Sequence, residues 1–364
     1  MSKPKPVSSS KPPSEPASRT NLLGYSKDQL EQLMVDMGER PFRGRQLFKW
    51  FYNTRQYDFA MMTDLSKDLR SRLAESFLFA PLVPEHEAVS ADGTIKFLFR
   101  LHDGHPVEAV LIPDDDSERK TLCISTQAGC ALGCRFCATG TMGLLRDLTP
   151  GEIVGQMMCL RDRFGEAAFT NVVMMGMGEP LMNFANVVAA LRIVTDSLGL
   201  GHAAKKVTIS TSGVSPKIKK LADTGLKTRL AISLHAADQA KRERIMPIAQ
   251  TFKLDKLMQA IRYYTDTTGF RVTFEYILFE GFNDTMEDVK ALARLIQGIP
   301  CKINLLAYNP IEGLDFRRPS DDKVDWFARQ LYPRAPAVTV RKSRGQDIDA
   351  ACGQLAAKHA IRRA

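Results

Sequence analysis

Residues 121–137 read TLCISTQAGCALGCRFC, in which an apolar run leads into a loop with the cysteine spacing C-x₃-C-x₂-C. Cys130, Cys134 and Cys137 could hold three irons of a cubane 4Fe–4S cluster, which would leave the fourth iron open for chemistry. A structural zinc site would need a fourth ligand, and residues 143–157 contain no Cys or His. The cysteines could also lie close together by chance, but their spacing favours a metal site.

Downstream of this stretch, apolar strands alternate with amphipathic helices in an α/β pattern. The expected strands are 121–126, 171–176, 206–211, 229–235, 271–279 and 301–308, and the expected helices are 150–164, 184–198, 215–224, 254–267, 285–297 and 322–331. Six βα units predict a parallel sheet with right-handed crossovers. Six are too few for a closed eight-stranded barrel, so we expect a partial (β/α)6 barrel over residues 120–342, with its site at the carboxyl ends of the strands.

The rest of the chain divides into four regions of different composition. They are a tail (1–21), a helical module (22–80), a meander (81–119) and a C-terminal segment (343–364). The tail is rich in Pro, Ser and Lys and is expected to be disordered. The helical module begins with a capping box at Ser26 and Gln29, and one of its faces is basic. Asp-Gly turns at 92–93 and 103–104 divide the meander into three antiparallel strands.

Composition limits the possible functions. The chain has 364 residues, 44% of them apolar, which is enough for a substantial core. Its seven cysteines fit a reducing cytosol better than a disulfide scaffold. No apolar run is long enough to cross a membrane and no signal core begins the chain, so a cytoplasmic protein is expected. The net charge of +9 suggests a polyanionic partner such as RNA, although each basic cluster could be an ordinary solvated surface.

Polar residues also follow the later strands. The second expected strand ends in GMGEP, whose Gly178 would allow close backbone approach and whose Glu179 could accept a hydrogen bond from an ammonium group. The other candidates, at the ends of the third, fourth and sixth strands, are Ser210, Ser233, Leu234, His235 and Asn309. Each alone could be a cap or a turn, and His235 could be a core histidine. Together they predict a ring of polar groups that binds a small cofactor.

These motifs resemble those of a known family. CALGCRFC, with Phe136 before its last cysteine, and GMGEP resemble the cluster loop and cofactor motif of radical SAM enzymes. Residues 344–355, RGQDIDAACGQL, resemble more narrowly the radical SAM RNA adenine methyltransferases that act on 23S rRNA. The likeness extends from about residue 22 to the end of the chain and includes STSG, SLHA and YNP.

The resemblance implies a reaction and its cofactors. A 4Fe–4S cluster and two molecules of S-adenosylmethionine (SAM) per turnover are expected, one SAM as methyl donor and one as radical source. The branch that the chain resembles most methylates adenine C2 in the peptidyl transferase centre of 23S rRNA and in tRNA, at the adenosine 3′ of the anticodon. A sister branch methylates C8 with the same motifs, so the C2 assignment depends on overall likeness.

The family also implies roles for two further cysteines and a carboxylate. Cys352 would take a methyl group from SAM as a thiolate nucleophile and then carry it as a methylene radical to the base. A Cys123–Cys352 disulfide would release the product, and external thiols would reduce it. Glu108, on the meander, would accept the C2 proton. Taken alone, each cysteine could be an inert buried thiol, and Glu108 could simply face solvent on its strand.

Partners and alternatives follow from the same resemblance. The helical module and the basic residues would hold folded RNA with the target base out of its stack. An electron-donor protein such as flavodoxin, no membrane and a monomeric enzyme are expected. A radical SAM enzyme acting on a protein or a small molecule would have no need of Cys352. A non-catalytic iron–sulfur protein that binds RNA would leave both extra thiols and the cofactor motifs without a purpose.

Overall fold

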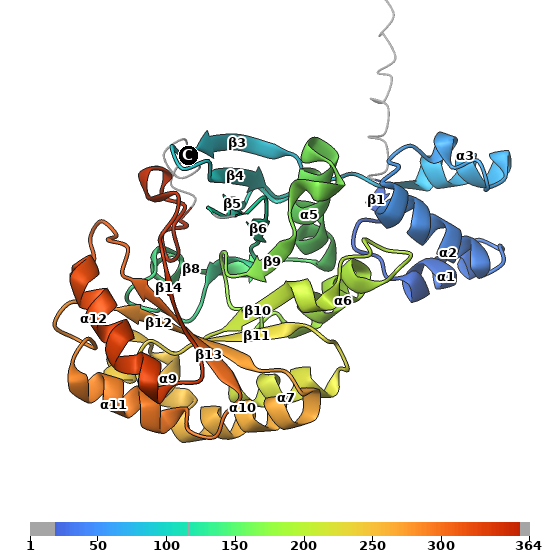
Figure 1. The fold of residues 1–364 in the computed structure, drawn as a ribbon. Coiled ribbons are helices and arrows are strands. Elements are labelled where there is room, and N and C mark those ends of the chain that lie inside the picture. The colour runs from blue at the N-terminus through green and yellow to red at the C-terminus, as the bar shows by residue number, and fades with distance from the viewer. Residues whose placement is uncertain (1–18, 116, 357–364) are drawn as a thin grey trace, which may run out of the picture.

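The structure is a computed structural model and describes residues 19–115 and 117–356. Figure 1 shows a twisted sheet with helices over its outer face, a meander at one end and the helical module beside it. Most of the expected tail, residues 1–18, lies outside the described residues. Thr20 and Asn21 form β1 and pair in parallel with β2 (Phe77–Leu78), so these two residues belong to the helical module and not to the tail.

Seven parallel strands form one side of the ten-stranded main sheet and run to its edge. They are β6 (Lys120–Cys123), β9 (Asn171–Met174), β10 (Val207–Thr211), β11 (Arg229–Ser233), β12 (Val272–Leu278), β13 (Cys301–Ala307) and β14 (Val338–Arg341). The first six are the predicted ones, and they lie in sequence order. The seventh, β14, was not expected. It pairs with β13 and forms an open edge, so the barrel is partial as predicted but has one extra strand.

Six helices follow the first six strands. They are α5 (Pro150–Phe164), α6 (Phe184–Thr195), α7 (Ser215–Asp223), α10 (Leu254–Thr268), α11 (Met286–Leu295) and α12 (Asp321–Leu331). The α5 helix begins with a capping box between Thr149 and Glu152, has Pro150 in its first turn, and ends at Gly165. Two short helices between β11 and α10 were not predicted: α8 (Gln239–Ile245) and α9 (Ile248–Thr251).

The meander is part of the main sheet. Its strands are β3 (Pro84–Val89), β4 (Ile95–Arg100) and β5 (Pro106–Pro113), divided by the two predicted Asp-Gly turns. Because β5 pairs antiparallel with β6, the meander continues the sheet beyond the first barrel strand. This pairing brings the middle of β5 next to the strand that leads into the cysteines.

The cysteine loop, residues 130–137, is part of the connection between the two strands of a small hairpin that the sequence did not predict. Strands β7 (Gln127–Cys130) and β8 (Gly143–Asp147) pair antiparallel, with α4 (Ala138–Thr141) between them. Arg146 on β8 forms ion pairs with Glu152 at the start of α5 and with Asp103 in a meander turn. The hairpin therefore fastens the loop to two neighbouring parts of the fold.

The helical module packs on the barrel through α5. It contains α1 (Lys27–Asp36), α2 (Phe42–Lys49), the π-helical turn Trp50–Thr54, the 3₁₀ turn Phe59–Met61 and α3 (Lys67–Ser76). The predicted Ser26–Gln29 capping box is present. Gly24 touches Gly151 so closely that a Cβ on Gly24 would lie 2.3 Å from the Gly151 nitrogen. Within the module, the Tyr52 hydroxyl accepts a hydrogen bond from the Gly24 nitrogen (2.9 Å), which fixes the segment that makes this close contact.

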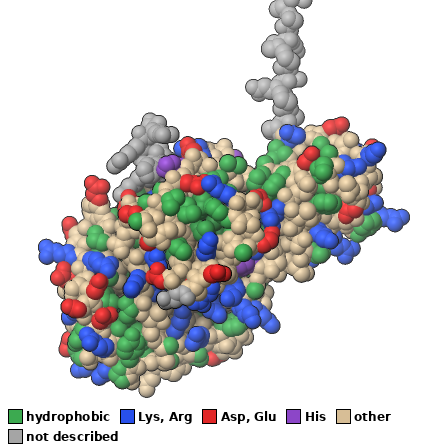
Figure 2. All heavy atoms as spheres, turned by 45° about the horizontal axis from the view of Figure 1, so that its top comes forward, with side chains coloured by type: hydrophobic (Ala, Val, Ile, Leu, Met, Phe, Trp, Pro, Cys, Tyr) green, Lys and Arg blue, Asp and Glu red, His purple; other side chains and the backbone are tan. Residues whose placement is uncertain are grey.

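Surface features bear on partners. Among the described residues, no helix is long and apolar enough to cross a membrane. Figure 2 shows Lys and Arg side chains over both the barrel half and the helical half of one face. The excess positive charge of the chain is therefore not confined to one domain on this face.

Candidate active site

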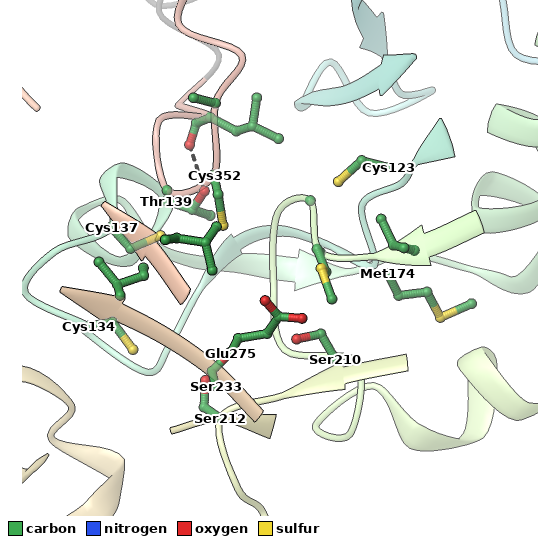
Figure 3. A pocket seen from close by; sticks show the side chains of 18 of the residues that line it. Cys123, Cys134, Cys137, Thr139, Met174, Ser210, Ser212, Ser233, Glu275 and Cys352 are labelled. Carbon is green, nitrogen blue, oxygen red and sulfur yellow. Dashed lines mark hydrogen bonds between the residues drawn. The ribbon is translucent and has the colours of Figure 1, made fainter. Parts of the chain in front are cut away.

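One cavity lies at the carboxyl ends of the parallel strands. Five of the seven cysteines line it: Cys123, Cys130, Cys134, Cys137 and Cys352. Figure 3 shows Cys123 and Cys352 pointing into it from different walls, with Cys134 and Cys137 on the side of the cysteine loop. Cys159 and Cys301 lie elsewhere, in α5 and β13, and are buried as expected of inert thiols.

The cysteine loop offers three free thiols in a largely apolar setting. Cys134 is buried, Cys130 and Cys137 are half-buried, and the backbone nitrogen of Cys137 donates to the Cys134 carbonyl (3.1 Å). Apolar side chains around the loop include Leu132 and Phe136. Burial raises the pKa of Cys130 to about 12, so without a metal this thiol keeps its proton at neutral pH.

This donor set fits an iron–sulfur cluster. Within residues 19–115 and 117–356, no three His, Cys, Asp or Glu side chains converge closely enough to hold one metal ion. A cubane cluster does not require such convergence, because each cysteine binds a different iron. Three thiols that line one enclosed apolar cavity satisfy the cluster's need for ligands and for shelter from water.

The GMGEP motif follows β9 and packs against the segment before the cysteines. Gly178 has φ +97°, and a Cβ there would lie 2.5 Å from the Gln127 Cβ. The Met177 nitrogen donates to the Ser125 hydroxyl (2.8 Å). Gly178 also lines the cavity, so the absence of a side chain leaves room both for Gln127 and for a ligand beside the backbone.

Glu179 lies in the wall of the cavity with its carboxylate already held. One oxygen accepts from the Leu181 nitrogen (3.0 Å) and the other from the Ser212 nitrogen (2.7 Å). Burial nevertheless raises the pKa of this carboxyl group. A cationic ligand in the cavity would restore the preference for the charged form, as the ammonium group of SAM would.

Only some of the other residues predicted to bind a cofactor lie in the cavity wall. Ser210, Ser233 and His235 line the cavity, whereas Leu234 and Asn309 do not. Leu234 is fully buried and its backbone nitrogen donates to the Glu275 carbonyl (3.0 Å), so its side chain belongs to the core. Asn309 donates from Nδ2 to the Cys352 carbonyl (3.2 Å), which makes it a support of the Cys352 loop in this structure.

His235 is a buried, neutral histidine at the edge of the cavity. Its Nδ1 accepts a hydrogen bond from the Ile277 nitrogen (3.1 Å), and its ring meets Phe136 edge to face at 4.9 Å between centroids. Burial lowers its pKa to about 3. Because Nδ1 is an acceptor, the proton of the neutral ring is on Nε2. The two interpretations of His235 made from the sequence are thus compatible.

The C-terminal loop, residues 343–356, carries Cys352 and is held from two sides. The cysteine loop side contributes Ala138, whose nitrogen donates to the Gly353 carbonyl (2.7 Å), and Thr139, whose hydroxyl donates to the Leu355 carbonyl (2.6 Å). The meander side contributes a hydrogen bond from the Ser90 hydroxyl to Asp347 (2.6 Å). These bonds hold the Cys352 thiol over the cavity.

The two extra thiols influence each other. The Cys352 side chain is exposed to the cavity, but surrounding protein atoms desolvate the thiol and raise its pKa to about 12, with Glu275 acting in the same direction. Burial likewise raises the pKa of Cys123 to about 12, and Cys352 adds to that shift. Both thiols are therefore protonated at neutral pH and close enough to interact electrostatically.

Two carboxylates lie where the sequence did not place them, Glu108 outside the cavity and Glu275 in its wall. Glu108 does not line the cavity: one oxygen lies 3.3 Å from the Lys96 amino group, and the other accepts from the Ala356 nitrogen (3.1 Å). Glu275 does line the cavity, accepts from Asn304 Nδ2 (2.8 Å), and was not singled out. A charged residue in the middle of the apolar strand 271–279 was the signal that could have identified it.

Comparisons with known proteins agree with this site. A family model described as "Ribosomal RNA large subunit methyltransferase N-terminal domain" matches residues 20–78, and a radical SAM superfamily model matches residues 124–296. The "Probable dual-specificity RNA methyltransferase RlmN" of Cytophaga hutchinsonii is 47% identical over 93% of each chain. The "Dual-specificity RNA methyltransferase RlmN" of Geobacter sulfurreducens is 46% identical over 93% of this chain and 92% of its own.

A solved structure shows the same architecture. A radical SAM methyltransferase from Sphaerobacter thermophilus superposes with a TM-score of 0.85 at 42% identity, covering 92% of this chain and 99% of that one. The helical module, the partial barrel and the C-terminal loop therefore form a fold that this relative shares over nearly its whole length. With relatives this similar over nearly the whole chain, the protein belongs to the RlmN family of radical SAM RNA methyltransferases.

Proposed function

We propose that this protein methylates C2 of adenosine in the peptidyl transferase centre of 23S rRNA and in tRNA, at the adenosine 3′ of the anticodon. The observation that carries this proposal is the arrangement of five cysteines around one cavity. Three have the spacing of a cluster loop, and two more, Cys123 and Cys352, come from elements far apart in the sequence. A methyltransferase that used only a polar transfer from SAM would need neither thiol.

The cavity also fits the cofactors that the family implies. When bound, a 4Fe–4S cluster and SAM supply the electron, the radical and the methyl groups. Cys130, Cys134 and Cys137 would hold the cluster. Glu179, with its raised carboxyl pKa, would bind the positively charged amino group of SAM. The remaining polar atoms of SAM would be bound by other polar groups of the cavity wall, which are Ser210, Ser233 and the Nε2 side of His235. Leu234 would contribute through its backbone, and Asn309 would contribute by supporting the Cys352 loop.

Cys352 would accept the methyl group, and Cys123 would release the product. The Cys352 thiol must lose its proton before it attacks, and its raised pKa means that deprotonation has to be favoured by positive charge in the cavity.

Forming the disulfide requires the Cys123 sulfur to reach the Cys352 sulfur. As the S–S bond forms, the bond between the Cys352 sulfur and the methylene carbon would break, and its electron pair would go to that carbon, which takes up a proton to become the methyl group. The unpaired electron left from radical addition would need an oxidant, which the oxidised cluster would supply. Cys123 is at the end of a sheet strand, so the C-terminal loop is the part that would move.

Glu108 would act as proton acceptor only in a rearranged loop. Its carboxylate is held by Lys96 and by the nitrogen of Ala356, outside the cavity. A movement of the C-terminal loop toward Cys123 would break the second contact and free an acceptor oxygen. We therefore link proton removal to the same movement that closes the disulfide.

The proposed partners are folded RNA and an electron-donor protein such as flavodoxin. The net charge of +9 supports RNA binding, because basic residues neutralise phosphates and release counterions. Seven free cysteines support a reducing compartment, which we take to be the cytoplasm. We propose that the enzyme acts as a monomer.

Mass spectrometry of digested RNA tests the function. Anaerobically reconstituted enzyme should convert 23S rRNA and tRNA that lack the modification to products containing 2-methyladenosine. The Cys352→Ala variant, reconstituted in parallel, should give unmodified RNA. A product containing 8-methyladenosine would instead assign the protein to the sister branch, which its dual-specificity relatives do not favour.

A further inference from the structure

Arg242 is a fully buried charge without a counter-charge. It lies on α8 and is among the largest side chains that are completely enclosed. Its neighbours form ion pairs at the surface of the helix, Lys241 with Asp288 and Glu243 with Lys253. Within the described part of the chain, no carboxylate pairs with Arg242. Burying a charge without an opposite partner is strongly unfavourable, so this arginine calls for a physical explanation.

Its hydrogen bonds satisfy only part of the guanidinium group. Nε donates to the Leu234 carbonyl (3.2 Å), and Nη2 donates to the carbonyls of Ser212 (2.6 Å) and Ser233 (3.2 Å). Nη1 is buried and has no hydrogen-bond partner among the described residues. Carbonyl oxygens accept hydrogen bonds but do not cancel the positive charge, and burial lowers the pKa of Arg242 to about 10.

Arg242 lies beside the cysteine loop. The end of α8 is joined to that loop, because the Arg135 nitrogen donates to the Ile245 carbonyl (2.9 Å). Ile245 and Cys134 belong to one buried apolar cluster. Ser212 and Ser233, whose carbonyls accept from Arg242, line the same cavity as Cys134. The guanidinium group therefore lies directly behind the cavity wall that the cysteine loop also lines.

We propose that Arg242 is the buried counter-charge of the iron–sulfur cluster and that it favours the reduced cluster. The inference rests on the proposed function, since it requires a cluster on Cys130, Cys134 and Cys137. Thiolate ligation makes the cluster and its ligands anionic, and reduction adds one further negative charge. A fixed positive charge in the low-dielectric interior stabilises the reduced form more than the oxidised form, which raises the reduction potential.

A purely structural role is the competing explanation. Arg242 ties together the ends of β10 and β11 through the carbonyls of Ser212 and Ser233, so its loss could loosen the cavity wall. Stability would then fall, but the potential of a cluster that still assembles would not. The reduction potential separates the two roles because it compares two redox states of the same folded variant.

The experiment uses anaerobically reconstituted full-length protein. Arg242→Gln keeps a donor for the carbonyls but removes the charge, and Arg242→Lys keeps the charge. Arg161→Met is the control for loss of a buried arginine. Arg161 is also buried and donates to a backbone carbonyl, that of Leu200, but it lies on α5, pairs with Glu166, and neither Arg161 nor Leu200 lines the cavity. Iron content gives the cluster loading. The EPR signal during titration with dithionite, which supplies one electron per cluster, gives the midpoint potential.

Arg242→Gln should bind as much iron as the wild type and be at least roughly tenfold harder to reduce, a shift of 59 mV for a one-electron couple. Arg242→Lys and Arg161→Met should stay near the wild-type potential. An Arg242→Gln variant with lower stability and an unchanged potential would overturn the inference. If that variant does not fold, Arg242→Lys decides through its pH dependence, because a buried lysine loses its charge at a lower pH than an arginine. The potential of Arg242→Lys should fall more steeply with rising pH than that of the wild type, and an identical pH dependence would overturn the inference. A wild-type protein that binds no cluster would refute the proposed function instead.

Discussion

The helical module and the C-terminal loop are held in place by different forces. The module is held by apolar packing, in which Leu47, Phe51 and Leu69 are fully buried in a core that continues into the barrel. The C-terminal loop is held mainly by separate hydrogen bonds, from the meander through Ser90 and from the cysteine loop through Thr139. A core gives a stable platform for binding RNA, whereas separate hydrogen bonds can break one at a time. The difference suits a loop that has to bring Cys352 to Cys123.

The largest expected effect lies at the cysteine loop, outside both regions. Replacing Cys134 with Ala should abolish cluster assembly and methylation, because three thiolates hold the cluster and a fourth protein ligand is absent from the loop. Iron analysis and an RNA methylation assay measure both losses. Circular dichroism should show a folded protein, and a variant that still binds four irons per chain would contradict the assignment.

Disrupting the apolar packing of the helical module should lower the free energy of unfolding of the whole protein or of the module. Phe51 is fully buried and stacks on Phe79 at 4.0 Å between ring centroids. Phe51→Ala should destabilise the protein by about 3–5 kcal/mol, measured by urea unfolding, and weaken RNA binding more than SAM binding. Phe42→Ala, on the exposed face of the same module, is the control and should change stability by less than about 0.5 kcal/mol. Equal losses for both variants would show that burial of Phe51 does not stabilise the module.

Removing hydrogen bonds that hold the C-terminal loop should make that loop more mobile without lowering the stability of the rest of the protein. Thr139→Val and Ser90→Ala each remove a hydrogen bond worth about 1–2 kcal/mol, one on each side of the loop. Hydrogen exchange of residues 343–356 should accelerate roughly tenfold while the midpoint of urea unfolding barely moves. Methylation should slow, because Cys352 is less well positioned. A fall in global stability as large as that of Phe51→Ala would remove the contrast between the two regions.

The same contrast explains what the sequence could predict. The α5 helix was predicted at residues 150–164, as observed, because its capping box and periodicity are local signals. The anchors of the C-terminal loop could not be predicted, since Ser90 and Asp347 are 257 residues apart. β14 was missed because four alternating residues give a weak signal, and the β7–β8 hairpin because its pairing spans the cysteine loop.

The same difference between local and distant signals applies to the candidate active site. Spacing predicted Cys130, Cys134 and Cys137 as cluster ligands, and resemblance predicted Cys352 as the methyl carrier; all four line the cavity. Neither showed that Leu234 belongs to the core or that Asn309 holds the Cys352 carbonyl. Glu275 was overlooked because its position beside the cavity depends on the whole sheet. Local motifs thus predicted which segments meet at the cavity, whereas contacts between distant segments were not predictable.

The smallest expected effect concerns the reactivity of Cys352 in protein without cofactors. Because burial, and then Glu275, raise the pKa of this thiol to about 12, its thiolate is scarce at neutral pH. Its alkylation by iodoacetamide at pH 8 should be at least roughly tenfold slower than in urea-unfolded protein, and the rate should still rise above pH 9. Glu275→Gln removes a negative charge and should make alkylation severalfold faster. Peptide mass spectrometry measures both rates, and a rate that levels off near pH 9 would contradict the raised pKa.

The most direct test of the account separates Cys123 from Cys352, which Figure 3 shows on different walls of the cavity. Reconstituted Cys123→Ala enzyme should accept the methyl group on Cys352 and react with RNA, but it lacks the thiol that releases the product. The expected result is a protein–RNA adduct through Cys352 that survives denaturation, disappears on RNase treatment and is absent from the Cys123→Ala/Cys352→Ala double variant. Full turnover by Cys123→Ala, or an adduct formed by Cys352→Ala alone, would contradict the division of roles between the two thiols.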